Sequence, residues 1–352
     1  MPDYLGSDRR RNILLNESEL KHGFSVLKSF PVNVQFSPTE RCNLSCIHCY
    51  RRKWGKTLYR EDMSLEILNT DAIQMSVSRA VSAWIVSGGE IFLYKKLKSL
   101  IDFFKKNKVN HLNTITNGTA ITEKMINYLV EKKFDEIKFS IDGATAKTVN
   151  LIRGRRVFER AIQTIRLINL KKEKQHRFFP RLIITMVIMK NNYFELPKLL
   201  SLSKKLHIYR VEVHHLQQLN DETSSLSMYN LQKDYDEIIK KSLKYAEKNK
   251  IILIHPPLFK GSVNQSNTDI ENYERCSQPW NFFLINQIGD VYPCCYLWGK
   301  PFGNVYKSSF QEIWNGKEFT NLRKNITKNI FAPTCLRSPC PKAELYKKVN
   351  NL

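Results

Sequence analysis

The sequence predicts an α/β fold in which parallel strands form an open sheet or a partial barrel. From residue 31 onwards, short apolar runs, several of them rich in β-branched residues, alternate with amphipathic runs. The runs with strand character are residues 32–36, 83–86, 112–116, 136–141, 182–189 and 209–213. Repeated alternation of strand and helix is typical of parallel strands joined by right-handed crossovers.

Helical segments separate these strands. Apolar side chains of residues 93–104 and 158–168 recur at three- and four-residue spacing, which places them on one helical face. A longer helix is predicted over residues 228–248, and the polar, proline-containing stretch from 256 to about 272 predicts a linker or lid. In such folds the residues that carry the chemistry collect at the carboxyl ends of the strands.

The 352 residues divide into four predicted parts. They are an N-terminal extension (1–30), an α/β core (31–225), a helix and linker (226–273) and a small cysteine-bearing domain (274–352). The last part is expected to hold no large apolar core of its own, so that bound metal would help to order it.

The composition indicates which partners and which cellular compartment the protein has. Lysine and arginine together number 56 against 33 acidic residues, which gives a formal net charge of +23. This charge favours acidic partners, although lysine pairs on the predicted helices are better explained as solvated faces. No apolar run approaches the roughly 18 residues of a membrane-spanning helix, and the N-terminus lacks the apolar stretch of a secretory signal. We therefore expect a cytoplasmic protein with no membrane partner.

The eight cysteines lie in two groups, which favours metal ligands over disulfides in a reducing compartment. Cys42, Cys46 and Cys49 form a C-x3-C-x2-C motif directly after the first predicted strand. Three thiolates on one tight loop can bind three irons of a [4Fe–4S] cube and leave the fourth iron open. Zinc is the alternative, but it normally takes a fourth protein ligand and paired C-x2-C spacing.

This cysteine spacing resembles that of the radical S-adenosylmethionine (radical SAM) superfamily. The resemblance implies a partial (β/α)6 barrel in which the open iron chelates SAM and the cluster cleaves it reductively. The 5′-deoxyadenosyl radical so formed takes a hydrogen atom from a substrate. His48 stands at the family's usually aromatic position, whose backbone typically meets the adenine.

Later strand ends resemble the segments that bind SAM in this superfamily. Ser87-Gly88-Gly89-Glu90 resembles the GGE motif, with Glu90 at the SAM amino group and Ile91 where the family usually has proline. The glycines are expected to let the backbone approach a bound ligand closely. The resemblance also implies that Arg153 pairs with the SAM carboxylate. The other residues it places around SAM are Gly88, Gly89, Asn117, Ser140, Asp142 and Ile188.

The C-terminal cysteines resemble the opening of SPASM and shorter twitch extensions, because twelve residues, Gly289 and four residues separate Cys276 from Cys294. This resemblance implies one auxiliary [4Fe–4S] cluster in a twitch-like domain. Its expected ligands are Cys276, Cys294, Cys335 and Cys340. The last spacing, C-x4-C, departs from the common C-x2-C, so Cys295 is an alternative ligand; its other roles are hydrogen donor or small buried hydrophobe. A structural zinc site is the alternative for the whole region.

The layout implies a radical SAM oxidoreductase that modifies a peptide by oxidation, crosslinking or epimerisation. A dehydrogenase or epimerase of a sugar-like or other small-molecule alcohol is the alternative, and an RNA-modifying enzyme or a non-catalytic zinc-binding module stands behind both. The chain lacks the aromatic-interleaved basic motif of single-strand binders, which argues against nucleic acid. A flavodoxin- or ferredoxin-type protein is the expected electron donor. Candidates for proton or hydrogen transfer are Glu212, His214 and His215 at the end of the sixth strand, and Cys295.

Overall fold

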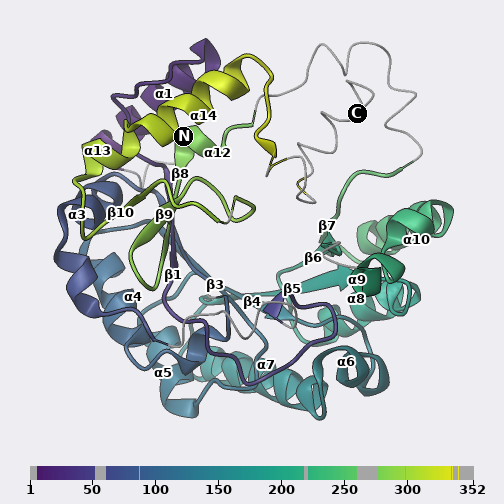
Figure 1. Cartoon of the computed structure of the whole chain (residues 1–352). Coiled ribbons are helices and arrows are strands. Elements are labelled where there is room, and N and C mark those ends of the chain that lie inside the picture. Colours follow the sequence, from purple (N-terminus) through teal and green to yellow (C-terminus); the bar gives the residue numbers. More distant parts are fainter. Residues whose placement is uncertain are drawn as a thin grey trace. The chain divides into compact units, whose positions relative to one another are not determined.

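The structure, a computed structural model, describes residues 6–51, 61–86, 88–217, 221–259, 276–297, 299–333, 335 and 340. These residues form two compact units (Figure 1). The first combines the described parts of Met1–Arg41, Tyr59–Leu112 and Asn272–Leu352; the second combines those of Cys42–Leu58 and Asn113–Glu271. In these units the N-terminal residues group with the C-terminal ones, and the predicted domain boundaries remain a prediction.

The strands of the first unit follow the order β10-β9-β8-β1-β2. Their bounds are β1 (Asn33–Ser37), β2 (Ser82–Ile85), β8 (Phe282–Asn286), β9 (Asp290–Tyr292) and β10 (Gly303–Asn304). β1 is parallel to both β2 and β8, whereas β9 is antiparallel to β8 and β10. The side chains of Val34 and Phe36, on one face of β1, are wholly buried. Because β8 is hydrogen-bonded to β1, the C-terminal strands β8, β9 and β10 continue the sheet of β1.

Helix α4 of the first unit packs through one apolar face. In α4 the side chains of Leu97, Leu100, Ile101 and Phe104 are buried, as their helical spacing predicts. The bounds of these elements are α1 (Ser7–His22), η1 (Leu65–Asn69), α3 (Asp71–Ser78), η2 (Ile91–Leu93), α4 (Leu97–Lys106), α12 (Gln278–Asn281), α13 (Phe310–Trp314) and α14 (Lys317–Thr327). The sequence analysis did not predict α1.

An aromatic core joins the two ends of the chain. Its buried rings belong to Trp280, Phe283, Phe310, Trp314 and Phe319. The Trp314 indole donates to the Ser29 carbonyl (2.9 Å), and the Asn16 amide donates to the Trp280 carbonyl (2.6 Å). The C-terminal part therefore shares its apolar core with N-terminal residues and does not hold it alone.

The second unit consists of parallel strands in the order β3-β4-β5-β6-β7. Their bounds are β3 (His111–Thr116), β4 (Glu136–Ser140), β5 (Arg181–Ile188), β6 (Arg210–His215) and β7 (Ile252–Ile254). The connecting elements are α5 (Glu123–Glu131), α6 (Ala146–Arg153), α7 (Val157–Lys174), η3 (Tyr193–Glu195), α8 (Leu196–Lys205), α9 (Asp221–Ser225), η4 (Met228–Asn230) and α10 (Gln232–Lys248). Figure 1 shows α5, α6, α7 and α8 along one side of these strands.

The predicted α/β class with parallel strands is confirmed, and each of the six predicted strands overlaps an observed one. The predicted helix over 228–248 is η4 followed by α10. Of the predicted linker or lid, residues 260–272 lie outside the described residues. The short strand β7 was not predicted. None of the described helices combines the length and apolarity needed to cross a membrane.

Candidate active site

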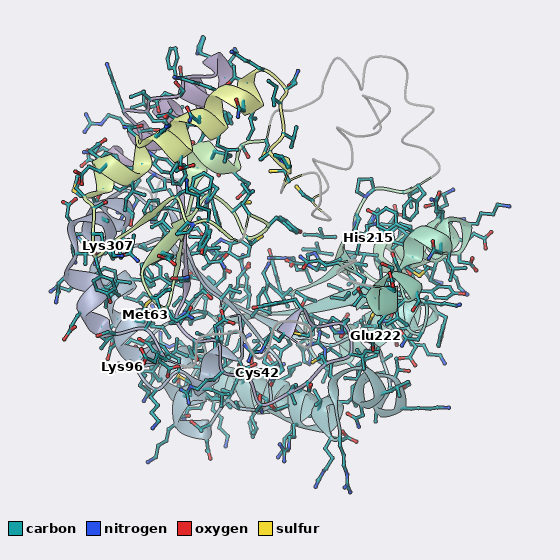
Figure 2. The ribbon with its side chains drawn as sticks, viewed as in Figure 1. Cys42, Met63, Lys96, His215, Glu222 and Lys307 are labelled. Carbon is teal, nitrogen blue, oxygen red and sulfur yellow. The ribbon has the colours of Figure 1, made fainter. Side chains whose placement is uncertain are left out.

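The cysteine loop of the second unit is anchored to the end of α6. The amide of Ile47 donates to the Ile152 carbonyl (3.0 Å), and the Cys49 amide donates to the Cys46 carbonyl (3.1 Å). Cys46 is buried, whereas Cys42, labelled in Figure 2, and Cys49 are half-buried. Burial raises the pKa of the Cys46 thiol to about 11, with Cys49, Asp142 and Cys42 adding to the rise and Arg153 opposing it.

This donor set fits an iron–sulfur cube. In a cube each thiolate binds a different iron, so the three thiols need not converge on one point. Among the described residues, no three His, Cys, Asp or Glu side chains converge on a position for a single metal ion. Bound iron would take the place of the proton that burial keeps on Cys46.

Asp142, wholly buried after β4, connects the loop to the sheet. Its Oδ1 accepts a hydrogen bond from the Val187 amide (2.9 Å), and its Oδ2 lies 2.7 Å from Nε of Arg153. Nη1 of Arg153 in turn lies 4.0 Å from Sγ of Cys46. Burial alone would lower the pKa of Arg153, but Asp142 outweighs burial and raises it. A fixed positive charge therefore lies beside the cysteine loop, and Arg153 is already paired within the protein.

His48 provides a free polar atom in this neighbourhood. Its Nε2 lies 3.8 Å from Oδ2 of Asp142, and burial lowers its pKa to about 4 despite that carboxylate. The ring is therefore neutral near pH 7. Its Nδ1 is buried and has no hydrogen-bond partner among the described residues, as expected of an atom that faces a ligand. The adenine contact of the His48 backbone remains a prediction.

Two residues that the sequence analysis missed hold the loop after β4. The side-chain amide of Asn192 donates to the backbone carbonyls of Asp142 and Val187, at 2.9 Å each. Glu195 accepts from the Ala144 amide (2.6 Å), and a Cβ on Gly143 would lie 2.7 Å from its Oε2. The available signal for Asn192 was its place in the polar stretch 190–192, which follows the buried strand β5 after one residue. No local pattern marks Glu195, because its partners lie about fifty positions away.

The other predicted SAM residues of the second unit have different surroundings. Asn117 donates to Oδ1 of Asn43 (3.0 Å), so it supports the cysteine loop. Ser140 ends β4 and is half-buried, with Thr185 beside it on β5. Ile188 is wholly buried, as a core side chain would be. Their contacts with SAM remain predictions.

In the first unit, Gly89 packs against protein backbone, which corrects the expected reason for this glycine. A Cβ at Gly89 would lie 2.0 Å from the Arg41 carbonyl oxygen, and the Glu90 amide donates to that same oxygen (2.8 Å). The glycine is therefore needed for the approach of the protein's own chain. Glu90 is buried, and its Oε1 accepts from the Phe92 amide (3.2 Å). The Gly88 amide donates to Oγ of Ser37 (3.2 Å), while Ser87 lies outside the described residues.

Arg41 itself is fixed by an ion pair. Its guanidinium contacts both carboxylate oxygens of Asp62 and donates to the Leu93 carbonyl (2.7 Å). Oδ1 of Asp62 also accepts from the Thr39 hydroxyl (2.6 Å). These bonds hold the residue that directly precedes Cys42.

Among the C-terminal cysteines, the buried Cys294 follows strand β9 and is the ligand that the hairpin was predicted to deliver. β8 and β9 form an antiparallel hairpin, and Gly289 adopts the left-handed φ of +84° that its turn requires. Burial, reinforced electrostatically by Cys276 and Cys340, raises the pKa of Cys335 to about 11. Cys295 is exposed as a residue, contrary to the buried-hydrophobe interpretation, although its thiol is covered enough to raise its pKa to about 11. The ligand roles remain predictions.

Of the three candidates on β6, His215 is part of an aromatic cluster. Its ring centroid lies 4.8 Å from that of Tyr235, 5.2 Å from that of Tyr229 and 5.4 Å from that of Phe259. Burial lowers its pKa to about 4. These contacts support a packing role and argue against proton transfer.

Glu212 is ionised at neutral pH. Burial raises its pKa, but the neighbouring His214 and hydrogen bonds from Lys138 and Arg210 outweigh burial and bring it to about 2. So low a pKa makes the carboxylate a poor proton acceptor. His214, next along the same face, has a side chain that is 57% exposed.

Two protein-family models match the chain. The radical SAM superfamily matches residues 36–203, and the iron–sulfur cluster-binding domain called SPASM matches residues 276–341. The chain is a radical SAM protein with a C-terminal SPASM domain. The radical SAM domain binds SAM at a [4Fe–4S] cluster, and the SPASM domain binds auxiliary iron–sulfur clusters. The single, twitch-like auxiliary cluster remains a prediction, because the match is to SPASM as a family.

Relatives of known function are distant but cover much of the chain. The antilisterial bacteriocin subtilosin biosynthesis protein AlbA of Bacillus subtilis is 24% identical over 315 residues, covering 88% of this chain. This chain spans 65% of the length of AlbA. The AdoMet-dependent heme synthase of Methanosarcina barkeri is 27% identical over 348 residues, which cover 92% of this chain and 91% of that protein.

The fold also resembles solved structures. SuiB of Streptococcus suis bound to SAM superposes with a TM-score of 0.70 at 19% identity, covering 95% of this chain and 76% of SuiB. At this identity the likeness establishes the fold alone. The two family matches identify the chain as a radical SAM enzyme with a SPASM domain, and AlbA is one of its homologues.

Proposed function

We propose that this enzyme cleaves SAM reductively to a 5′-deoxyadenosyl radical, which abstracts a hydrogen atom from a peptide and leads to oxidation, crosslinking or epimerisation. The observation that carries the proposal is the pairing of a radical SAM domain with a SPASM domain, shared with AlbA over 88% of the chain. SuiB, which shares the fold, also has a structure bound to its precursor peptide SuiA.

Within the second unit, Cys42, Cys46 and Cys49 would hold the [4Fe–4S] cluster, which supplies the electron for SAM cleavage when bound. Arg153, held by Asp142, offsets part of the negative charge that thiolates and cluster bring into this buried region. Neutral His48 offers Nδ1 to a bound ligand. In the first unit, Glu90 is the proposed partner of the SAM amino group.

The auxiliary cluster would be held by cysteines of the first unit. Cys276, Cys294, Cys335 and Cys340 are the proposed ligands, and all four lie within the SPASM match. Electrons would come from an acidic flavodoxin- or ferredoxin-type protein. The formal net charge of +23 supports such a partner, because opposite charges speed encounter between proteins.

A second candidate is a small-molecule substrate, including the sugar-like alcohols considered above. The specific support is the heme synthase relative, since its match extends over nearly all of both chains. That enzyme is named for the synthesis of heme, which is not a peptide, and this supports a non-peptide substrate as the second candidate.

The test is 5′-deoxyadenosine release by anaerobically reconstituted, reduced enzyme. The peptide fraction and the small-metabolite fraction of an extract of the source organism are added separately. Release stimulated by the peptide fraction alone supports the proposal; stimulation by the metabolite fraction alone replaces it with the second candidate. Cys46→Ala should abolish release, whereas His207→Asn, an exposed change in the same unit, should leave it unchanged.

A further inference from the structure

One face of the second unit's sheet carries an unusual row of charged side chains. Residues that pair across parallel strands share a face, and side chains two positions apart along a strand do too. The register Lys138↔Ile183↔Arg210 and Ser140↔Thr185↔Glu212 therefore places Lys138, Arg210 and Glu212 on one face. Glu136 and His214 extend this face by one step at either end.

Hydrogen bonds connect four charged residues of this row, namely Glu136, Lys138, Arg210 and Glu212. Nη1 and Nη2 of Arg210 donate to the two carboxylate oxygens of Glu136, at 2.8 Å each, and Nε donates to Glu212 (2.7 Å). Nζ of Lys138 donates to both oxygens of Glu212, at 2.8 and 3.1 Å. Glu136, Lys138 and Glu212 are buried. Two carboxylates thus balance two cations.

Such a network is a weak source of stability. Removing charges from water costs about as much as their mutual attraction returns, and apolar replacements are often neutral or stabilising. Buried charged groups with perturbed pKa values are therefore candidates for function. The network ends at Glu212, and the next side chain along that face is His214.

His214 differs from every other member of the row because it is open. Its side chain is 57% exposed, and its Nε2 lies 3.8 Å from Oε2 of Glu212. At this distance the carboxylate attracts a proton to Nε2 without a hydrogen bond in the present arrangement, and Nδ1 is then the nitrogen left to accept a proton. The other titratable neighbour is His215, whose low pKa keeps it neutral.

His214 also lies at the carboxyl edge of the sheet, close to the SAM-binding residues of the same unit. It pairs with Val187 on β5, and the Val187 amide donates to Asp142. Adjacent strands are about 4.8 Å apart, so His214 lies on the order of 10 Å from the loop after β4. His214 is therefore exposed at the same edge of the sheet as the proposed SAM-binding residue Asp142.

From this arrangement we propose that His214 accepts a proton from the substrate and that Glu212, held by Lys138 and Arg210, positions it. In that step a bond from hydrogen to a substrate oxygen or nitrogen breaks, and its electron pair stays on the substrate. An N–H bond forms at Nδ1 of His214. The proposal rests on the proposed function, because it takes the substrate to be the molecule whose hydrogen atom is abstracted.

The test compares His214→Ala with wild type in the reconstituted holoenzyme. Both extract fractions are supplied, and modified product is counted per 5′-deoxyadenosine released. General acid–base catalysis contributes roughly 10²–10⁴-fold, so product per release should fall about 100-fold while stimulated release persists. Added imidazole should restore much of the product, since an exposed site admits it. His207→Asn should behave as wild type.

Three results would overturn the inference. The first is that His214→Ala forms as much product per 5′-deoxyadenosine released as wild type. The second is that the variant loses stimulated release together with product. The third is that product per release falls in the variant and added imidazole does not restore it. The failure of the peptide proposal has a different signature, because wild type would then respond to the metabolite fraction alone. The ratio for His214→Ala is read in whichever fraction stimulates release, and stimulation by neither overturns both proposals.

Discussion

The two cysteine regions are supported in different ways. The loop that contains Cys46 is held by distant residues, since Arg153, which contacts its thiol, lies 107 positions later. Cys294 instead follows a hairpin whose turn is built from neighbours, with Oδ1 of Asn286 accepting from the amides of Ile288 and Asp290. A site held by neighbours can be found by a local pattern, whereas a site held by distant buried charges depends on the whole unit.

The largest expected effect comes from removing the charge that supports the first region. Asp142→Asn would leave Arg153 buried without its carboxylate, which costs about 3–5 kcal/mol of unfolding free energy. Urea unfolding and iron content per chain measure it. Asp8→Asn, which breaks an exposed pair with Arg11, is the matched control and should change neither quantity. Wild-type stability and iron in Asp142→Asn would show that the loop does not depend on this pair.

Acid should weaken the same unit. The folded state lowers the pKa of Glu212 from 4.5 to about 2, so the unfolded chain binds the proton more readily. The associated stability is present above about pH 4.5 and is lost as pH falls towards 2; it amounts to about 3 kcal/mol. Urea midpoints across this range, in wild type and Glu212→Gln, measure the difference. An equal acid slope in both proteins would contradict the assignment.

A smaller effect is expected where the backbone before the first cysteine meets the glycine loop. In Gly89→Ala the new Cβ would lie 2.0 Å from the Arg41 carbonyl oxygen, so the backbone must shift at a cost of about 1–3 kcal/mol. The melting temperature and the iron content should both fall. Gly6→Ala, where nothing lies within 4 Å of the added atom, should leave the iron content unchanged. Retained iron in Gly89→Ala would show that this approach does not position the loop.

The smallest effect is expected at Cys295. If Cys276, Cys294, Cys335 and Cys340 hold the auxiliary cluster, Cys295→Ala leaves the iron content per chain unchanged. Cys294→Ala, one position earlier, should lose the auxiliary iron and keep that of the Cys42 loop. Iron analysis with electron paramagnetic resonance of the reduced protein separates the two clusters. If Cys295→Ala loses the auxiliary iron and Cys340→Ala keeps it, Cys295 is the ligand and Cys340 is not.

Much of this protein was predictable from its sequence alone. Strand and helix periods are local, so the strands from β1 to β6 and the helix α10 could be predicted from runs of a few residues. The spacing of Cys42, Cys46 and Cys49 is likewise local, because one tight loop must present all three thiols. The turn at Gly289 belongs to the same class.

Only the tertiary structure decided which polar groups meet. Two histidines that are adjacent in sequence differ in their surroundings. His214 is exposed to solvent beside a carboxylate, whereas His215 packs against Tyr229, Tyr235 and Phe259. Glycine 89 was expected to admit a ligand, yet the Arg41 backbone occupies that space. The helix α1 was missed because its buried residues are Asn12, Asn16 and Glu19, whose partners lie outside the helix. Burial, charge pairing and close backbone approach depend on residues that are distant in sequence, so no local pattern could have predicted them.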